Sequence, residues 1–248
     1  MFEFSYLGRS VDISIEGCFE PNLTTKIMLN ATIKYLSDKE IKYKNLLEIG
    51  CGSGVISAYL LKHRLLNSIE NVCMSDLSEQ AVKITEKNIL ENLLDCRNPN
   101  FEFKVGSGLK IWNDYQFDII INDISAISEA IVPMNDWFSN APNNAGIDGV
   151  ANSIQVLQEF SAMPQSDAIM LMPVLSLSNI QILMTEIKNL GLEVQKIAQQ
   201  SWPLPRDMVK THNEKLLQLR NDGHINFEEK FGNMVVETAC YKVWKVEG

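Results

Sequence analysis

The spacing of apolar and polar residues changes along the chain from strict alternation to longer blocks. Residues 2–6 and 11–15 both alternate apolar with polar positions, and a Gly-Arg pair lies between them. Period-two alternation on both sides of a glycine predicts a β-hairpin. Pro21 and Thr24 or Thr25 then introduce a helix, because proline and threonine favour the first positions of helices.

Strand-like and helix-like segments alternate after a polar run at 37–40 ends this first helix. We expect strands at about 45–50, 71–76, 101–106, 117–122, 167–174 and 192–199, and helices at 54–66, 78–93, 148–162 and 176–190. Such alternation predicts a mostly parallel sheet with helices on both faces.

The end of the chain departs from this rhythm. Pro203 and Pro205 precede a charged helix at about 206–221, and an Asn-Asp-Gly turn leads to a long strand at Met234–Val246. A terminal strand reached without a simple crossover helix suits an antiparallel addition. The sequence therefore predicts an α/β fold with a doubly wound, mostly parallel seven-stranded sheet, an antiparallel last strand and a small N-terminal hairpin and helix. We divide it into this addition, residues 1–40, and a main domain, residues 41–248.

Composition narrows the class of protein. The chain has 248 residues, 46% hydrophobic and 21% charged, as in an ordinary single-domain globular protein. Its cysteines are odd in number, far apart and without a C-x-x-C pair, which favours reduced thiols in a cytoplasmic protein over disulfides or a zinc site. These cysteines are Cys18, Cys51, Cys73, Cys96 and Cys240. No apolar run is long enough to span a bilayer, and no leader pattern begins at Met1, so we expect no membrane partner.

The net charge of −9 argues against a large nucleic-acid surface, because phosphate binding needs clustered lysine and arginine. A local basic groove remains compatible with this charge. Such a groove would be built from Lys34, Lys42, Lys44, Arg206 and Lys210.

The segment 46–57 is the most informative part of the chain. An apolar run ends at Ile49, Gly50, Gly52 and Gly54 follow at alternate positions, and a helix-like segment begins directly afterwards. Glycines let the backbone come close to a ligand, and a helix N-terminus offers unpaired N–H groups, so this pattern predicts a nucleotide-binding corner. The dinucleotide pattern G-x-G-x-x-G fails here in both registers. A glycine-rich turn without a ligand is the alternative.

Asp76 ends the second predicted strand of the sheet. A carboxylate there faces the same crevice as the glycine turn, because ligands bind at the carboxyl ends of parallel strands. Its two oxygens can accept both hydroxyls of an adenosine ribose. Alternatively, Asp76 merely precedes a helix that Ser78 caps.

The spacing Glu48-x-Gly50-x-Gly52-x-Gly54 resembles the first motif of class I S-adenosylmethionine (SAM) dependent methyltransferases. The resemblance implies a Rossmann-like fold and SAM as cofactor, with Glu48 beneath its methionine end and Ser107, in a Gly-Ser-Gly loop, beside its adenine. The cofactor-binding residues that we expect are Glu48, Gly50, Cys51, Gly52, Gly54, Asp76, Leu77, Ser107 and Asn122.

A second motif lies at 117–125, an apolar strand that ends in polar residues. With the helix start at 21–25 and the segment 146–149, it resembles the release-factor glutamine methyltransferase group and the related small-domain RNA methyltransferases. In these families the strand ends in Asn-Pro-Pro-Tyr or Asp-Pro-Pro-Tyr. Asn122 matches the first position, whose implied role is a hydrogen bond that orients the target nitrogen. Asp123 and the two residues after it depart from the motif.

Asn122 and Asp123 are our candidate catalytic residues. Asp123 supplies a carboxylate that could position or deprotonate an amine, a hydroxyl or an acidic carbon, and the alternative is a cap on the next helix. Trp202, in a proline-bounded loop, is a candidate substrate wall or a core residue, and His212 could reach the crevice from its helix.

The resulting prediction is an enzyme that transfers a methyl group from SAM to nitrogen, oxygen or carbon of a small molecule or protein side chain. Residues 1–40 would cap the substrate side of the main, SAM-binding domain. One alternative is an RNA base methyltransferase that uses the basic groove above. Another is a SAM-binding domain that regulates a partner without catalysis.

Overall fold

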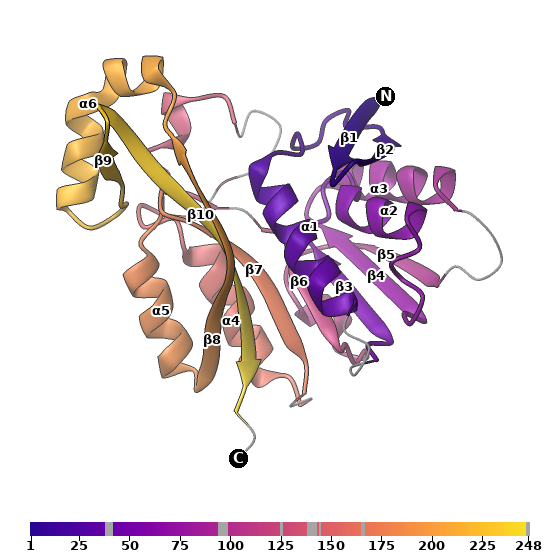
Figure 1. Ribbon diagram of the computed structural model, residues 1–248. Helices are drawn as coiled ribbons and strands as arrows, with labels where there is room; N and C mark the ends of the chain where they lie inside the picture. The colour runs from indigo at the N-terminus through magenta and orange to yellow at the C-terminus, as the bar shows by residue number, and fades with distance from the viewer. Residues whose placement is uncertain are drawn as a thin grey trace.

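The computed structural model (Figure 1) describes residues 1–37, 42–93, 99–124, 126–137, 143, 145–164 and 167–246. Cys96, Ser125 and the boundary predicted at residue 40 lie outside the described residues. An antiparallel hairpin precedes one central sheet, which has helices on both faces.

The central sheet has the strand order β5-β4-β3-β6-β7-β10-β8, and the short strand β9 pairs with β10. Strands β3 to β7 pair in parallel, whereas β10 runs antiparallel to both of its neighbours. The strands are β3 (Asn45–Ile49), β4 (Asn71–Asp76), β5 (Asn100–Val105), β6 (Ile119–Asn122), β7 (Ile169–Leu175), β8 (Leu192–Pro203), β9 (Glu228–Lys230) and β10 (Asn233–Lys245). The predicted fold is confirmed. Among the described strands, β9 was not predicted, and it makes the sheet eight-stranded instead of seven-stranded; its three exposed charged residues carry no apolar signal.

The helices follow the predicted sequence of elements. They are α1 (Leu23–Leu36), α2 (Val55–Lys62), α3 (Glu79–Glu91), α4 (Ala151–Ala162), α5 (Ile180–Asn189) and α6 (Arg206–Asn221), with 3₁₀ turns η1 (Lys110–Trp112) and η2 (Val132–Met134). Helix α1 begins at a capping box formed by Asn22 and Thr25.

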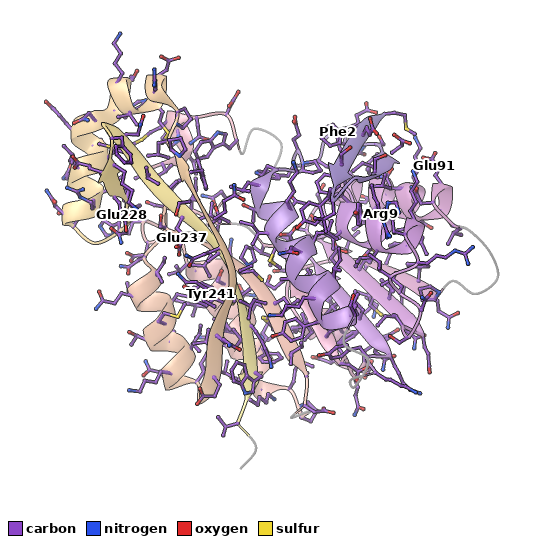
Figure 2. The ribbon with its side chains drawn as sticks, in the orientation of Figure 1. Phe2, Arg9, Glu91, Glu228, Glu237 and Tyr241 are labelled. Atoms are coloured by element: carbon purple, nitrogen blue, oxygen red, sulfur yellow. The ribbon has the colours of Figure 1, made fainter. Side chains whose placement is uncertain are left out.

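The N-terminal hairpin joins β1 (Phe2–Tyr6) and β2 (Arg9–Ile13) through a two-residue turn. The predicted second strand began two residues too late, because Leu7 and Gly8 both have positive φ and form a tighter turn than expected. Figure 2 shows Phe2 and Arg9 of this hairpin at the same corner of the molecule as Glu91, the last residue of α3.

Strand β8 is longer than predicted and includes Trp202 and Pro203, which pair with Val236 and Val235 of β10. The prediction of a loop around Trp202 is therefore wrong. Pro203 has no backbone N–H, and it is tolerated because β8 is an edge strand, in which the N–H groups on the outer side need no partner strand.

Three hydrophobic clusters hold these layers together. One packs α1, α2 and the hairpin on one face of the sheet, and a second packs α4 and α5 on the other face. The third fills the far end of the sheet, where α6 and β9 cover the ends of β8 and β10. The carboxyl edge of β3, β4 and β6 thus lies between the hairpin side and α4, and the candidate site is found there.

Candidate functional site

The glycine turn between β3 and α2 presents bare main chain. Gly50 and Gly52 have φ values of +71° and +55°, which glycine adopts without strain. A Cβ on Gly50 would lie 3.3 Å from the backbone carbon of Asp123, so a glycine is needed for β3 to pass the end of β6. A Cβ on Gly52 would meet no atom within 4 Å. The turn therefore faces open space at Gly52.

Helix α3 holds this turn from behind. The Thr85 hydroxyl donates to the Gly52 carbonyl at 3.0 Å, and the Asn88 amide donates to the carbonyls of Ser53 at 2.7 Å and Ser14 at 2.8 Å. Thr85 and Asn88 are fully buried. Sequence reasoning missed them, although two polar residues on the apolar face of a helix are a usable signal.

Asp76 joins the glycine turn to the start of α3. Its Oδ2 accepts from the N–H of Gly52 at 3.0 Å, and its Oδ1 accepts from the N–H of Ser78 at 2.9 Å. Ser78 caps α3 as expected, through Ala81. The partly exposed carboxylate of Asp76 can still accept further donors, because each oxygen has two lone pairs.

The loop after β5 is anchored by α4. Glu159 is buried, and its Oε2 accepts from the N–H groups of Leu109 at 2.6 Å and Lys110 at 3.4 Å. Its Oε1 accepts from the Gln155 side chain at 3.1 Å. This anchor, which sequence reasoning missed, fixes the Gly-Ser-Gly loop that contains Ser107. A lone glutamate inside a helix carries no sequence signal of such a role.

Three acceptor oxygens without a partner lie where β3 and β6 end. Glu48 Oε1, Asn122 Oδ1 and Asp123 Oδ1 are buried and have no hydrogen-bond partner among the described residues. The N–H of Asp123 donates to the Ile49 carbonyl at 2.9 Å, which ties the two strand ends together. The second oxygen of Glu48 accepts from Ser57. Buried acceptor atoms in proteins normally have a hydrogen-bond donor, so these three oxygens are exceptions whose donors are missing among the described residues.

The same burial changes the acidity of the two carboxyl groups. Burial raises the pKa of Glu48 to about 7, although the Ser57 hydroxyl opposes the shift. Burial, with the negative charges of Glu48 and Asp76, raises the pKa of Asp123 well above its ordinary value. The next helical element that the structure describes is η2, which begins at Val132, so the alternative in which Asp123 caps the following helix is wrong.

A cavity of about 220 Å³ connects these features. Of the predicted site residues, it is lined by Gly50, Cys51, Gly52, Asp76, Leu77, Ser107 and Asp123. Glu48, Gly54 and Asn122 lie outside its lining: Glu48 and Asn122 are buried behind the glycine turn, and Gly54 begins α2. Segment 17–25, before and within α1, also lines the cavity with Phe19 and Thr25, and it belongs to the N-terminal part expected to cap the substrate side. Helix α4 provides a further wall, with Asn152, that sequence reasoning did not predict.

Trp202 and His212 do not line this cavity. The Trp202 indole donates to Thr238 at 3.0 Å and packs edge-to-face on Trp137, with ring centroids 5.6 Å apart, in the third cluster. His212 lies at a kink within α6.

The five basic residues of the RNA alternative lie at two ends of the sheet. Lys34 is near the end of α1, and Lys42 and Lys44 precede β3 at the amino edge, away from the cavity. Arg206 and Lys210 are on α6, which follows the carboxyl end of β8. These residues do not form one basic strip, so the structure does not support that alternative.

Part of this chain is similar in sequence to known methyltransferases. Residues 24–123 match the sequence model of the family described as methyltransferase small domain. A release factor glutamine methyltransferase from Fusobacterium nucleatum is 29% identical over 129 residues, which are 51% of this chain and 33% of that protein. A ribosomal protein L11 methyltransferase from Helicobacter acinonychis is 33% identical over 94 residues, 38% of this chain and 26% of that protein. The matches thus span a third or less of these curated relatives.

Solved structures share the fold at low sequence identity. The ribosomal protein L11 methylase from Lactobacillus delbrueckii aligns with a TM-score of 0.54 and 14% identity, over 79% of this chain and 84% of the other. The Mtq2–Trm112 complex from E. cuniculi, which methylates the termination factor eRF1, aligns with a TM-score of 0.53 and 13% identity, over 93% and 99% of the chains. Among the described residues, no helix has the length and apolar character needed to cross a membrane.

Proposed function

We propose that this chain, whose residues 24–123 match the sequence model of the methyltransferase small domain family, transfers a methyl group from SAM to nitrogen, oxygen or carbon of an acceptor. The acceptor is a small molecule or a protein side chain. The curated relatives are named as methyltransferases of a release factor and of a ribosomal protein, and these names favour the protein side chain.

One observation carries the proposal: the cavity is lined jointly by the glycine turn after β3 and by the carboxylate that ends β4. At Gly52 the space that a Cβ would fill is open, and Asp76 has acceptor capacity to spare beside it. A ligand with vicinal hydroxyls and an extended chain suits these features. The residues present therefore fit SAM.

Each part of the site has a separate role in this proposal. Asp76 accepts the ribose hydroxyls, the main chain of Gly50–Gly52 lies along the ligand, and the loop at Ser107 borders the adenine. Glu48 provides negative charge beneath the methionine end when it is ionised. The cofactor supplies a methyl group already activated by its sulfonium, so the protein has only to align the acceptor and exclude water.

Asn122 and Asp123 stand at the acceptor end of the site. Asn122 is buried at the end of β6 and acts on the acceptor indirectly, by positioning the segment that follows it. Asp123 begins that segment and lines the cavity. Residues 1–40 cap the substrate side, since segment 17–25 lines the cavity, and residues 41–248 bind the cofactor. We also propose a cytoplasmic location, because the described cysteines are free thiols.

Calorimetric titration of the protein with S-adenosylhomocysteine (SAH) tests the cofactor, with NAD and ATP as controls. We expect the protein to bind SAH and not to bind NAD or ATP. Failure to bind SAH would contradict the proposal. Incubation with methyl-labelled SAM and cell lysate tests the reaction, with the label sorted into protein, RNA and small molecules. Label in RNA would revive the nucleic-acid alternative. SAH binding without label in any fraction would favour a regulatory SAM-binding domain.

A further inference from the structure

The charge lining the cavity is of one sign. Asp76 and Asp123 are the charged side chains among the described residues that line it, and no lysine, arginine or histidine is among them. Asp76 already accepts from two backbone N–H groups, whereas Asp123 Oδ1 accepts from none of the described residues. Among the described residues, Asp123 is therefore the lining carboxyl group with an oxygen, Oδ1, that has no donor and with no cationic side chain beside it in the lining.

The topology puts Asp123 at the opposite end of the site from Asp76. Asp76 ends β4 and Asp123 follows β6, and β3 with its glycine turn lies between them. Neighbouring strands are about 4.8 Å apart, so two strand spacings, roughly 10 Å, separate the backbones of β4 and β6. A ligand anchored at Asp76 by its ribose and laid along the glycine turn brings its reactive end toward Asp123.

The surroundings of Asp123 call for a donor-rich cation. Glu48 Oε1 and Asn122 Oδ1, at the same pair of strand ends, also lack donors among the described residues, but both lie outside the cavity lining, so Asp123 Oδ1 is the unpartnered acceptor that a ligand in the cavity meets. An ammonium group brings three N–H donors and a positive charge, whereas a hydroxyl brings one donor and no charge. A primary amide brings two donors and no charge. Of these acceptor groups, the ammonium best satisfies the site.

We propose that the acceptor is an amine, which enters as an ammonium ion and gives its proton to the Asp123 carboxylate. This inference rests on the proposed function and names its substrate class. The raised pKa of Asp123 is consistent with it: burial disfavours the carboxylate in the free protein, the positive charge of a bound ammonium ion favours it, and the weaker acid is the stronger base toward the ammonium proton.

The step balances as follows. One N–H bond of the ammonium breaks, and the proton moves to a carboxylate oxygen of Asp123. The freed nitrogen lone pair attacks the methyl carbon, the carbon–sulfur bond breaks, and its electron pair stays on sulfur. The products are an N-methylammonium ion and the thioether SAH, and Asp123 releases its proton to water.

Sinefungin tests this without knowledge of the acceptor. It is an analogue of SAM that carries a primary amine on the carbon that replaces the methylsulfonium centre, so its ammonium lies where methyl and acceptor meet. The wild-type protein should bind sinefungin roughly 10- to 100-fold more tightly than SAH, as expected for one charge-assisted hydrogen bond. In Asp123→Asn this preference should disappear while SAH affinity stays as in the wild type. Asp114→Asn, an exposed carboxylate outside the cavity lining, is the matched control and should keep the preference.

Several results would overturn the inference. Equal wild-type affinity for sinefungin and SAH removes the proposed ammonium site. If a folded Asp123→Asn variant loses affinity for both ligands equally, Asp123 contacts the part of the molecule that the two ligands share. Failure of SAH itself to bind refutes the proposed function as well, and so the two failures are distinguishable.

The labelled product gives a second, independent readout. Methyl label on an amine stays attached to the acceptor through strong acid and base, which is the expected result. Release of methanol in base would identify an ester, and release of methylamine in acid would identify an amide. Either release contradicts an amine acceptor.

Discussion

Removal of the Asp76 carboxylate should separate ligand binding from folding. In Asp76→Ala the cavity loses the charged acceptor that we assign to the ribose, a contact worth about 1.5–3 kcal/mol, or roughly a 10- to 100-fold rise in Kd for SAH. The free protein also loses stability, because the N–H groups of Gly52 and Ser78 lose their acceptor.

Asp118→Ala is a control with the same local chemistry. Asp118 Oδ2 also accepts from two backbone N–H groups, those of Lys44 at 2.6 Å and Asn45 at 2.8 Å, at the amino edge of the sheet. This variant should lose stability in the free form as Asp76→Ala does. Its affinity for SAH should not change, because it lies at the other edge from the cavity.

Thermal unfolding with and without SAH measures both effects. At an SAH concentration about 1,000 times the wild-type Kd, the ligand should stabilise the wild type by about 4.1 kcal/mol, and a variant with 100-fold weaker binding by about 1.4 kcal/mol. For a chain of this size, 1 kcal/mol corresponds to roughly 2–4 °C in Tm. The reasoning is refuted if Asp76→Ala keeps the full ligand shift, or if Asp118→Ala loses it to the same extent.

Four further predictions concern other residues of the site. Gly52→Val should lose some stability, since valine is strained at a φ of +55° even though no atom of the described residues lies within 4 Å of its Cβ; titration of the folded variant should show at least a tenfold loss of SAH affinity, and undiminished binding would contradict the site. Asn122→Ala should lower methyl transfer to the lysate more than SAH affinity, and normal turnover would move the acceptor elsewhere. Glu159→Ala should cost about 2–4 kcal/mol in urea unfolding and weaken SAH binding, whereas a purely structural role would leave the binding intact. The folded-state pKa of Glu48 is raised to about 7, so the protonated side chain stabilises the fold fully below about pH 4.5, and this contribution is lost as the pH rises through 7. The unfolding free energy of the wild type should therefore fall between pH 5 and 8, and Glu48→Gln should make this fall smaller. An unchanged slope would contradict the burial argument.

Much of the fold followed from local pattern. The strand predicted at 71–76 and the helix at 206–221 coincide with β4 and α6, because apolar blocks, polar breaks and prolines act within a few residues. β9 could not be predicted, since its pairing with β10 stabilises a segment without strand pattern. Trp202 was misplaced for a related reason: its edge position, which makes Pro203 acceptable, is a property of the assembled sheet.

The residues of the candidate site also fall into two groups, those that local sequence identified and those whose role depends on tertiary contacts. The sequence by itself determined the glycine turn and Asp76, because a turn with positive φ and a carboxylate at a strand end leave a signature in a short segment. Only the tertiary structure decided that α3 supports the turn through Asn88, that Glu159 fixes the loop of Ser107, and that Asp123 Oδ1 has no donor among the described residues. These properties depend on contacts between segments far apart in the chain, and the physical reason is that burial and hydrogen-bond partners are set when the layers pack together.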